Sequence, residues 1–154
     1  MDDNSNESFL KAIDITQDVI KRMAHNSFLI KGWTITLVVV ALLLKGSQEH
    51  IFLAIIPVVT FWLLDAYFLR QERLYRKLYN ELINKKSESK RNIFDMNTDE
   101  FKEKVSVKGT IFSKTLIWFY GTISVLIGMY ACISSDKVIT IFDNLNTLFN
   151  NATA

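Results

Sequence analysis

The chain has 154 residues, of which 49% are apolar and 22% charged, with a formal net charge of +2. Its charged residues are separated from three long apolar runs, whereas a water-soluble domain mixes the two at amphipathic spacing. The charge is too small for a nucleic-acid binder, and the single Cys132 supports neither a disulfide framework nor a cysteine-based zinc site. The composition predicts an all-α integral membrane protein without a cofactor.

Residues 1–27 are predicted to form a cytoplasmic amphipathic helix, because apolar residues such as Phe9, Ile13 and Ile20 recur at helical spacing. Two placements are open for it. It either pairs with a second cytoplasmic helix or lies flat in the headgroup layer, and five acids against three Lys and Arg favour the first. In that case Asp14 and Asp18 should lie near basic residues of the second helix.

Residues 28–69 are predicted to form a transmembrane hairpin with spans at 28–44 and 51–69, because about 20 apolar residues cross a core of ~30 Å. The first span holds one cation, Lys31, and the second holds one anion, Asp65. Folding the hairpin near residue 48 puts them at the same depth. Three readings remain open: an ion pair, two side chains that reach the interface independently, or a role for Asp65 in moving ions or protons.

Residues 70–114 are predicted to be a basic cytoplasmic helical region. Leu74, Leu78 and Leu82 recur every four residues, so the second span should continue as one helix of about 35 residues. Its basic surface should face anionic lipid headgroups and is a candidate site for a cytoplasmic protein partner. The residues of this surface are Arg70, Arg73, Arg76 and Lys77. Further on, Asn97 and Glu100 have the spacing of a capping box that begins a short helix before the third span.

Residues 115–133 are predicted to be the third transmembrane helix. Small residues recur on one face of it, at Gly121, Ser124, Gly128 and Cys132, which is a spacing that favours close helix contact in membranes. Packing against the chain's own hairpin and contact with a second copy in a homo-oligomer both explain this face. Residues 134–154 are predicted to form an extracytoplasmic amphipathic tail.

Orientation follows from the distribution of Lys and Arg. Residues 70–114 contain twelve of them, whereas residues 45–50 and 134–154 contain one each. The positive-inside rule therefore places the N-terminus in the cytoplasm and the C-terminus outside. In this topology Trp33, Trp62 and Trp118 all fall toward the cytoplasmic ends of their spans, where tryptophan is expected to anchor a helix at the interface.

Two stretches, residues 22–33 and 61–79, read RMAHNSFLIKGW and FWLLDAYFLRQERLYRKLY. Together with the residues around them, about 15–80, they resemble a widespread group of small, mostly uncharacterised bacterial inner-membrane proteins found near mobile elements and anti-phage defence loci. The resemblance implies a bacterial inner-membrane location and importance for the Lys31/Asp65 region and residues 70–79. It supplies no catalytic residues.

Enzymatic activity is not expected. His25 and His50 fall on opposite sides of the membrane in this topology, and Cys132 lies within a span far from both, so no catalytic set can be assembled. Two functions remain. The first is an oligomeric membrane effector that perturbs or permeabilises the inner membrane in a defence or stress response. The second is a membrane anchor or scaffold that recruits a cytoplasmic partner through its basic helices.

Overall fold

The computed structural model describes residues 3–43, 51–84 and 95–133, and all its regular elements there are helical. In chain order these are α1 (Asp3–Leu43), α2 (Ile51–Asn84), the 3-10 turn η2 (Asp99–Phe101), α3 (Val107–Ile111) and α4 (Lys114–Ile133). The sequence-based expectation of an all-α chain is confirmed for this part. The expected 45–50 turn and the amphipathic tail at 134–154 lie outside the described residues.

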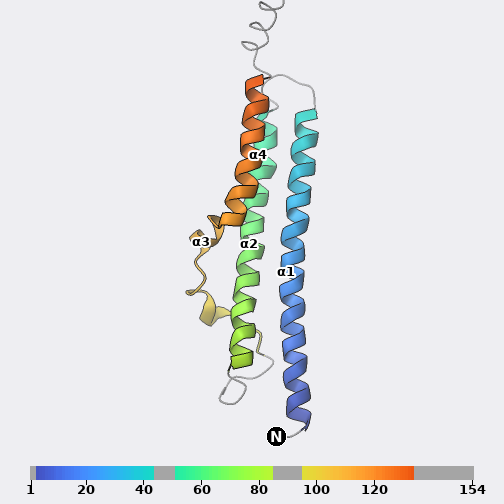
Figure 1. Cartoon of the computed structure of the whole chain (residues 1–154), viewed down its shortest axis with the longest axis vertical. Coiled ribbons are helices and arrows are strands. Elements are labelled where there is room, and N and C mark those ends of the chain that lie inside the picture. The colour runs from blue at the N-terminus through green and yellow to red at the C-terminus, as the bar shows by residue number, and fades with distance from the viewer. Residues whose placement is uncertain (1–2, 44–50, 85–94, 134–154) are drawn as a thin grey trace, which may run out of the picture.

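Helices α1 and α2 form a long antiparallel hairpin (Figure 1). Helix α1 has 41 residues and α2 has 34, which at 1.5 Å per residue gives lengths of about 60 and 50 Å. The expected cytoplasmic helix 1–27 and first span are therefore one continuous helix, and α2 continues well past residue 69. Both helices extend beyond the ~30 Å that a bilayer core requires.

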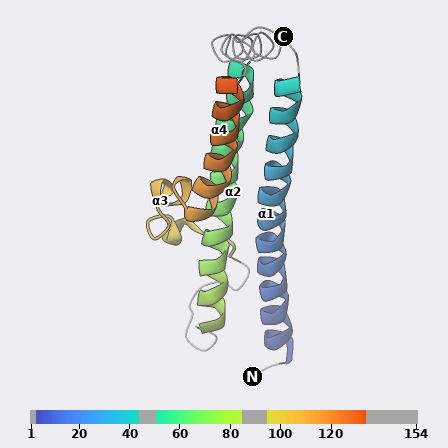
Figure 2. The same ribbon diagram turned by 45° about the horizontal axis from the view of Figure 1, so that its top comes forward.

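Helix α4 packs along the N-terminal half of α2 (Figures 1 and 2). Its buried face consists of Leu116, Tyr120, Ile123 and Ile127, which recur at three- and four-residue steps. These side chains lie in one apolar cluster with small α2 residues, Ala54 and Ala66 among them. Small side chains on α2 let the two helix backbones approach closely.

The segment 95–113 lies beside α2. Its part from Asp99 onward is on the side away from α1 (Figure 2), whereas the Met96 Sδ atom lies 3.6 Å from the Thr16 hydroxyl of α1. Phe101 and Val105 are buried against Leu74 and Leu78 of α2, so the leucine repeat that predicted the long second helix packs against this segment. The Asn97 side chain accepts a hydrogen bond from the Asp99 N–H (2.9 Å), which begins the 3-10 turn η2. The short helix expected after Asn97 is thus a single turn.

Within the described residues, three helices are long and apolar enough to cross a membrane: Asn6–Leu43, Leu53–Asn84 and Lys114–Ile133. Large apolar side chains point outward from all three, for example Phe28, Ile56 and Trp118. Exposed apolar surface of this extent is unusual for a soluble monomer and marks a surface that lipid or protein covers. The fold is consistent with a multi-pass membrane protein.

Candidate functional site

Asp65 of α2 is fully buried where α1, α2 and α4 meet. The Lys31 Nζ atom of α1 lies 2.6 Å from Asp65 Oδ2, and the Ser27 hydroxyl donates to Asp65 Oδ1. From α4, the Tyr120 hydroxyl lies 3.2 Å from Asp65 Oδ2. A buried carboxylate is tolerated only when it is paired and hydrogen-bonded, and here donors from two other helices meet that requirement.

The donors are themselves held in place. Lys31 Nζ donates to the Ser27 hydroxyl at 2.9 Å and lies 5.9 Å from the centre of the Phe119 ring. The Tyr120 hydroxyl also lies 3.0 Å from the Phe61 carbonyl oxygen. Because a phenol has one proton, Tyr120 donates either to Phe61 or to Asp65 at a given moment. Each of the three helices thus contributes at least one polar group to the junction.

The local sequence explains the α1 side of this junction. Ser27 and Lys31 are four residues apart and so share a helix face with the buried Thr34. The Thr34 hydroxyl donates to the Ile30 carbonyl of its own helix at 2.8 Å, so it is buried without losing a hydrogen bond. The sequence placed Lys31 and Asp65 at one depth, and the structure brings them into contact. The residue pattern did not predict that Ser27 and Tyr120 belong to this junction. The four-residue step from Ser27 to Lys31, which puts both on one helix face, could have indicated Ser27.

The junction has the chemistry of a structural contact. The carboxylate and ammonium neutralise each other, and within the described residues no group of three His, Cys, Asp or Glu side chains is arranged to hold a metal ion. Asp65 is inaccessible and its partners are already bonded to it. The described residues therefore place a buried, three-helix polar connection here.

Trp62 takes a different role from the one expected. Its indole Nε1 donates to the Ile111 carbonyl at 3.0 Å, and its ring stacks on Tyr120 with centroids 6.2 Å apart and meets the Phe112 edge at 6.1 Å. It joins α2 to the corner between α3 and α4 and is not an outward-facing anchor. Trp33 and Trp118 are 59% and 77% exposed, as interface residues would be.

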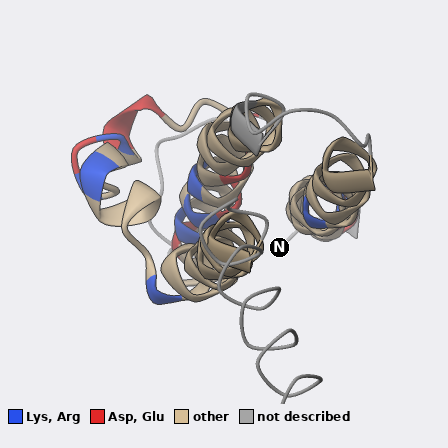
Figure 3. Ribbon diagram, turned by 90° about the horizontal axis from the view of Figure 1, so that it is seen from above, with Lys and Arg blue, Asp and Glu red and all other residues tan. Residues whose placement is uncertain are grey.

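Arg70 also differs from the rest of the predicted basic surface. Its Nε donates to the Val105 carbonyl at 3.2 Å and its Nη2 to the Lys102 carbonyl at 3.4 Å, so this half-buried side chain holds the segment 95–113 against α2. Figure 3 shows Lys and Arg on α2 and on the neighbouring segment. On that segment, the Lys102 ammonium next to Asp99 holds the pKa of this exposed carboxyl below its usual value.

The small residues of α4 do not pack within the described part of the chain. Gly121, Ser124, Gly128 and Cys132 are all exposed, because α4 faces α2 through the larger residues described above. A Cβ atom added at Gly121 or Gly128 would meet nothing within 4 Å. Of the two explanations left open by the sequence, packing against the hairpin is not what the structure shows.

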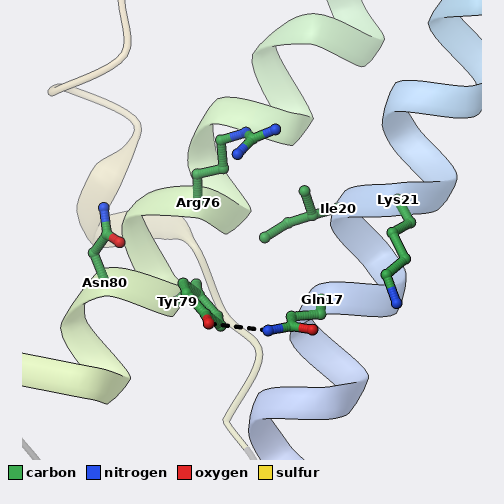
Figure 4. Close-up of a pocket in the computed structure, with 6 residues that line it drawn as sticks. All are labelled: Gln17, Ile20, Lys21, Arg76, Tyr79 and Asn80. Carbon is green, nitrogen blue, oxygen red and sulfur yellow. Dashed lines mark hydrogen bonds between the residues drawn. The ribbon is translucent and has the colours of Figure 1, made fainter.

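A groove separates α1 and α2 away from the apolar zone (Figure 4). The Gln17 amide donates to the Tyr79 hydroxyl at 2.9 Å across it, and a cavity of about 340 Å³ lies beside this bond. Asp18 pairs with Lys21 of its own helix at 3.4 Å. Asp18 therefore does not make the expected ion pair with basic residues of α2. The contact between the two helices at this level is instead the neutral hydrogen bond between Gln17 and Tyr79.

Comparison with known protein families, with curated proteins and with solved structures finds no match to this chain. The fold and the junction define a helical hairpin with a third helix packed on one half of it.

Proposed function

We propose that this protein is a non-enzymatic, multi-pass protein of a bacterial inner membrane that forms homo-oligomers through α4 and, as an oligomer, perturbs or permeabilises the membrane in a defence or stress response. The observation that carries the proposal is the exposed row of small residues on α4. The defence context rests on the sequence resemblance alone.

The membrane boundaries follow from α4. Its 20 residues give a length of about 30 Å, which equals the thickness of a bilayer core. The Tyr120 hydroxyl contacts both the Phe61 carbonyl and Asp65, and α2 runs antiparallel to α4, so the first residue of α4, six residues before Tyr120, lies about level with Leu69. Arg70 follows Leu69 directly, so the charged part of α2 begins where the apolar layer ends. Asp65 then lies about four residues, or ~6 Å, inside the layer.

Self-association is favoured by the shape of the exposed α4 face. Lipid tails are as apolar as the side chains, so moving an apolar side chain from lipid into a helix contact gains little free energy. Membrane helices therefore associate where small residues let their backbones approach closely. Gly128 and its neighbours provide such a surface without any partner inside the described chain. A single copy places Asp65 in a closed, neutral junction and offers no polar path there, so permeation requires several copies.

The topology predicts the outcome of reporter fusions. A reporter that is active only in the cytoplasm should work when it is fused after Lys90 and fail when it is fused after Ala154, because the Lys and Arg excess holds residues 70–114 inside. Activity at both sites, or the reverse pattern, would contradict three crossings with a cytoplasmic N-terminus.

The oligomer contact predicts the effect of added bulk on α4. Gly128→Leu should block the approach of neighbouring α4 helices and reduce the mass of the detergent-solubilised complex to that of one chain. Gly32→Leu is a matched control, because Gly32 on α1 is also exposed with nothing within 4 Å of an added Cβ. Cys132, one turn beyond Gly128 and exposed, should crosslink two wild-type chains with a short thiol reagent and fail to do so in Gly128→Leu.

The same variants test function. Induced expression of the wild-type chain and of Gly32→Leu should depolarise cells and arrest growth, whereas Gly128→Leu should be inserted at equal level without either effect. A monomeric wild-type complex, or depolarisation by Gly128→Leu equal to that of the wild type, would contradict the proposal.

The anchor function has its own supporting observation. Helices α1 and α2 continue far beyond the apolar layer and form a polar groove there, with Gln17 and Tyr79 at its centre (Figure 4). Such a surface suits recruitment of a cytoplasmic protein. An inserted oligomer or monomer that never depolarises cells would favour this function.

A further inference from the structure

Four cations converge where the segment 95–113 meets α2. Arg73, Arg76 and Lys77 of α2 and Lys104 of the segment line one cavity of about 310 Å³. It is separate from the groove in Figure 4, although Arg76 borders both. The i, i+3, i+4 spacing of the three α2 residues puts them on one face of the helix, and the packing of the segment, held by Arg70, brings in the fourth.

The positive charge of this cavity is largely uncompensated. No acidic residue lines it. Arg76 uses its Nε atom to pair with Glu72 at 2.7 Å, which leaves its terminal nitrogens free of that bond. Among the described residues no carboxylate lies within ion-pair distance of Arg73, Lys77 or Lys104. Like charges that line one cavity repel one another, so a bound anion would stabilise the arrangement.

The side of the cavity opposite α2 consists mainly of small residues, Ser106, Gly109 and Thr110, which hydrogen-bond to one another. The Ser106 hydroxyl accepts from the Gly109 N–H at 3.3 Å, and the Thr110 hydroxyl donates to the Ser106 carbonyl at 2.9 Å. The Thr110 hydroxyl proton is used in this way, whereas the Ser106 hydroxyl still has its own proton to donate, and Gly109 has no side chain to fill the space. The charged side chains of α2 and Lys104, together with the Ser106 O–H, would therefore make the contacts to an anion.

The cavity lies at the depth of lipid headgroups if the membrane boundaries are those proposed above. Arg73 is four residues beyond Leu69 and Lys77 is eight, which places their backbones about 6 and 12 Å outside the apolar core. The headgroup layer on each side is roughly 5–8 Å thick, and long basic side chains reach further toward it.

We propose that this cavity binds the phosphodiester headgroup of an anionic phospholipid, with Arg73 and Lys104 as its main contacts and Arg76 and Lys77 at its rim. Basic pockets beside membrane helices on the cytoplasmic side are suited to this chemistry, because phosphate oxygens accept several charge-assisted hydrogen bonds at once. The proposal depends on the membrane placement of the proposed function and does not depend on oligomerisation.

The test is lipid binding to the full chain in detergent, measured by native mass spectrometry with added phosphatidylglycerol or phosphatidylcholine. The wild-type chain should retain phosphatidylglycerol selectively. Arg73→Gln with Lys104→Gln should weaken its binding about 100-fold, since each substitution removes a charge-assisted hydrogen bond to the phosphate, and such a bond contributes a factor of about ten. Lys102→Gln with Lys108→Gln is the matched control: both lysines are exposed on the same segment and neither lines the cavity, so binding should be unchanged.

Equal weakening in the pocket variant and the control would overturn the proposal, because it would show attraction to diffuse charge. Binding of inorganic phosphate as tightly as phosphatidylglycerol would also overturn it, in favour of a soluble anion. If Arg73→Gln prevents folding, Lys77→Gln with Lys104→Gln tests the same cavity through an exposed α2 residue. Wrong reporter topology would refute the membrane placement, whereas correct topology without selective lipid binding would refute only this site.

Discussion

Asp65→Ala should lower the free energy of unfolding of the detergent-solubilised protein by about 3–5 kcal/mol, which is the cost of leaving one member of a buried ion pair without the other. Lys31→Ala should cost at least as much. Asp65 is fully buried and has no route to solvent, whereas the Lys31 side chain is 20% exposed and can extend away when its partner is lost. The measurement is thermal or denaturant unfolding of each variant.

The double variant Lys31→Ala with Asp65→Ala should recover part of the loss, because removing both charges leaves no unpaired ion. The exposed pair of Asp18 and Lys21 is the control, with side chains 75% and 73% exposed. Alanine at either of these positions should change stability by less than about 1 kcal/mol. Additive losses at Lys31 and Asp65 would mean that the two groups reach the interface independently.

Trp62→Ala should be the most damaging change among the three tryptophans, with a loss of about 3 kcal/mol or more. It removes the stacking on Tyr120, the edge contact with Phe112 and the hydrogen bond to the Ile111 carbonyl together. The corner between α3 and α4 should then open, and trypsin should cut at Lys114 faster than in the wild type.

Trp62→Phe separates the two contributions, because it keeps an aromatic ring and removes the donor to Ile111. Its cost should be about 1–3 kcal/mol, the penalty of one unpaired carbonyl. Trp118→Ala is the control, since Trp118 is 77% exposed, and it should leave unfolding nearly unchanged. Similar losses at both positions would contradict the packing role of Trp62.

Most of the helices could be predicted from the lengths of the apolar runs and from the periodicity of apolar residues. The three runs and the leucine repeat at 74, 78 and 82 predicted the long α2 and a third helix at 115–133, one residue from the observed start at Lys114. Hairpin symmetry was enough to place Lys31 and Asp65 at one depth. These predictions depend on the spacing of apolar residues along one helix or on the single chain reversal between the first two helices. Both can be read directly from a sequence.

Contacts with the third helix were not predictable in the same way. The depth of Tyr120 relative to Asp65 depends on how the segment 95–113 folds. The residue pattern of this segment does not determine that fold. Trp62 and Arg70 show the same limit. Their residue types suit an interface or a basic surface, but each binds a carbonyl of the 95–113 segment that only the tertiary packing brings within reach.

The hydrogen bonds of Trp62 and Tyr120 have a mechanical consequence for α4. Apolar contacts between helices in lipid resist sliding only weakly, because the side chains exchange one apolar neighbour for another. A shift of α4 by one helical turn, about 5.4 Å, would break the Trp62 bond to Ile111 and move the Tyr120 hydroxyl away from both of its acceptors. Intermediate positions would leave these groups without hydrogen-bond partners, which is costly for buried polar atoms. The axial position of α4 on α2 is therefore set by directional hydrogen bonds as well as by apolar packing, and sliding of α4 along α2 would require these bonds to break first.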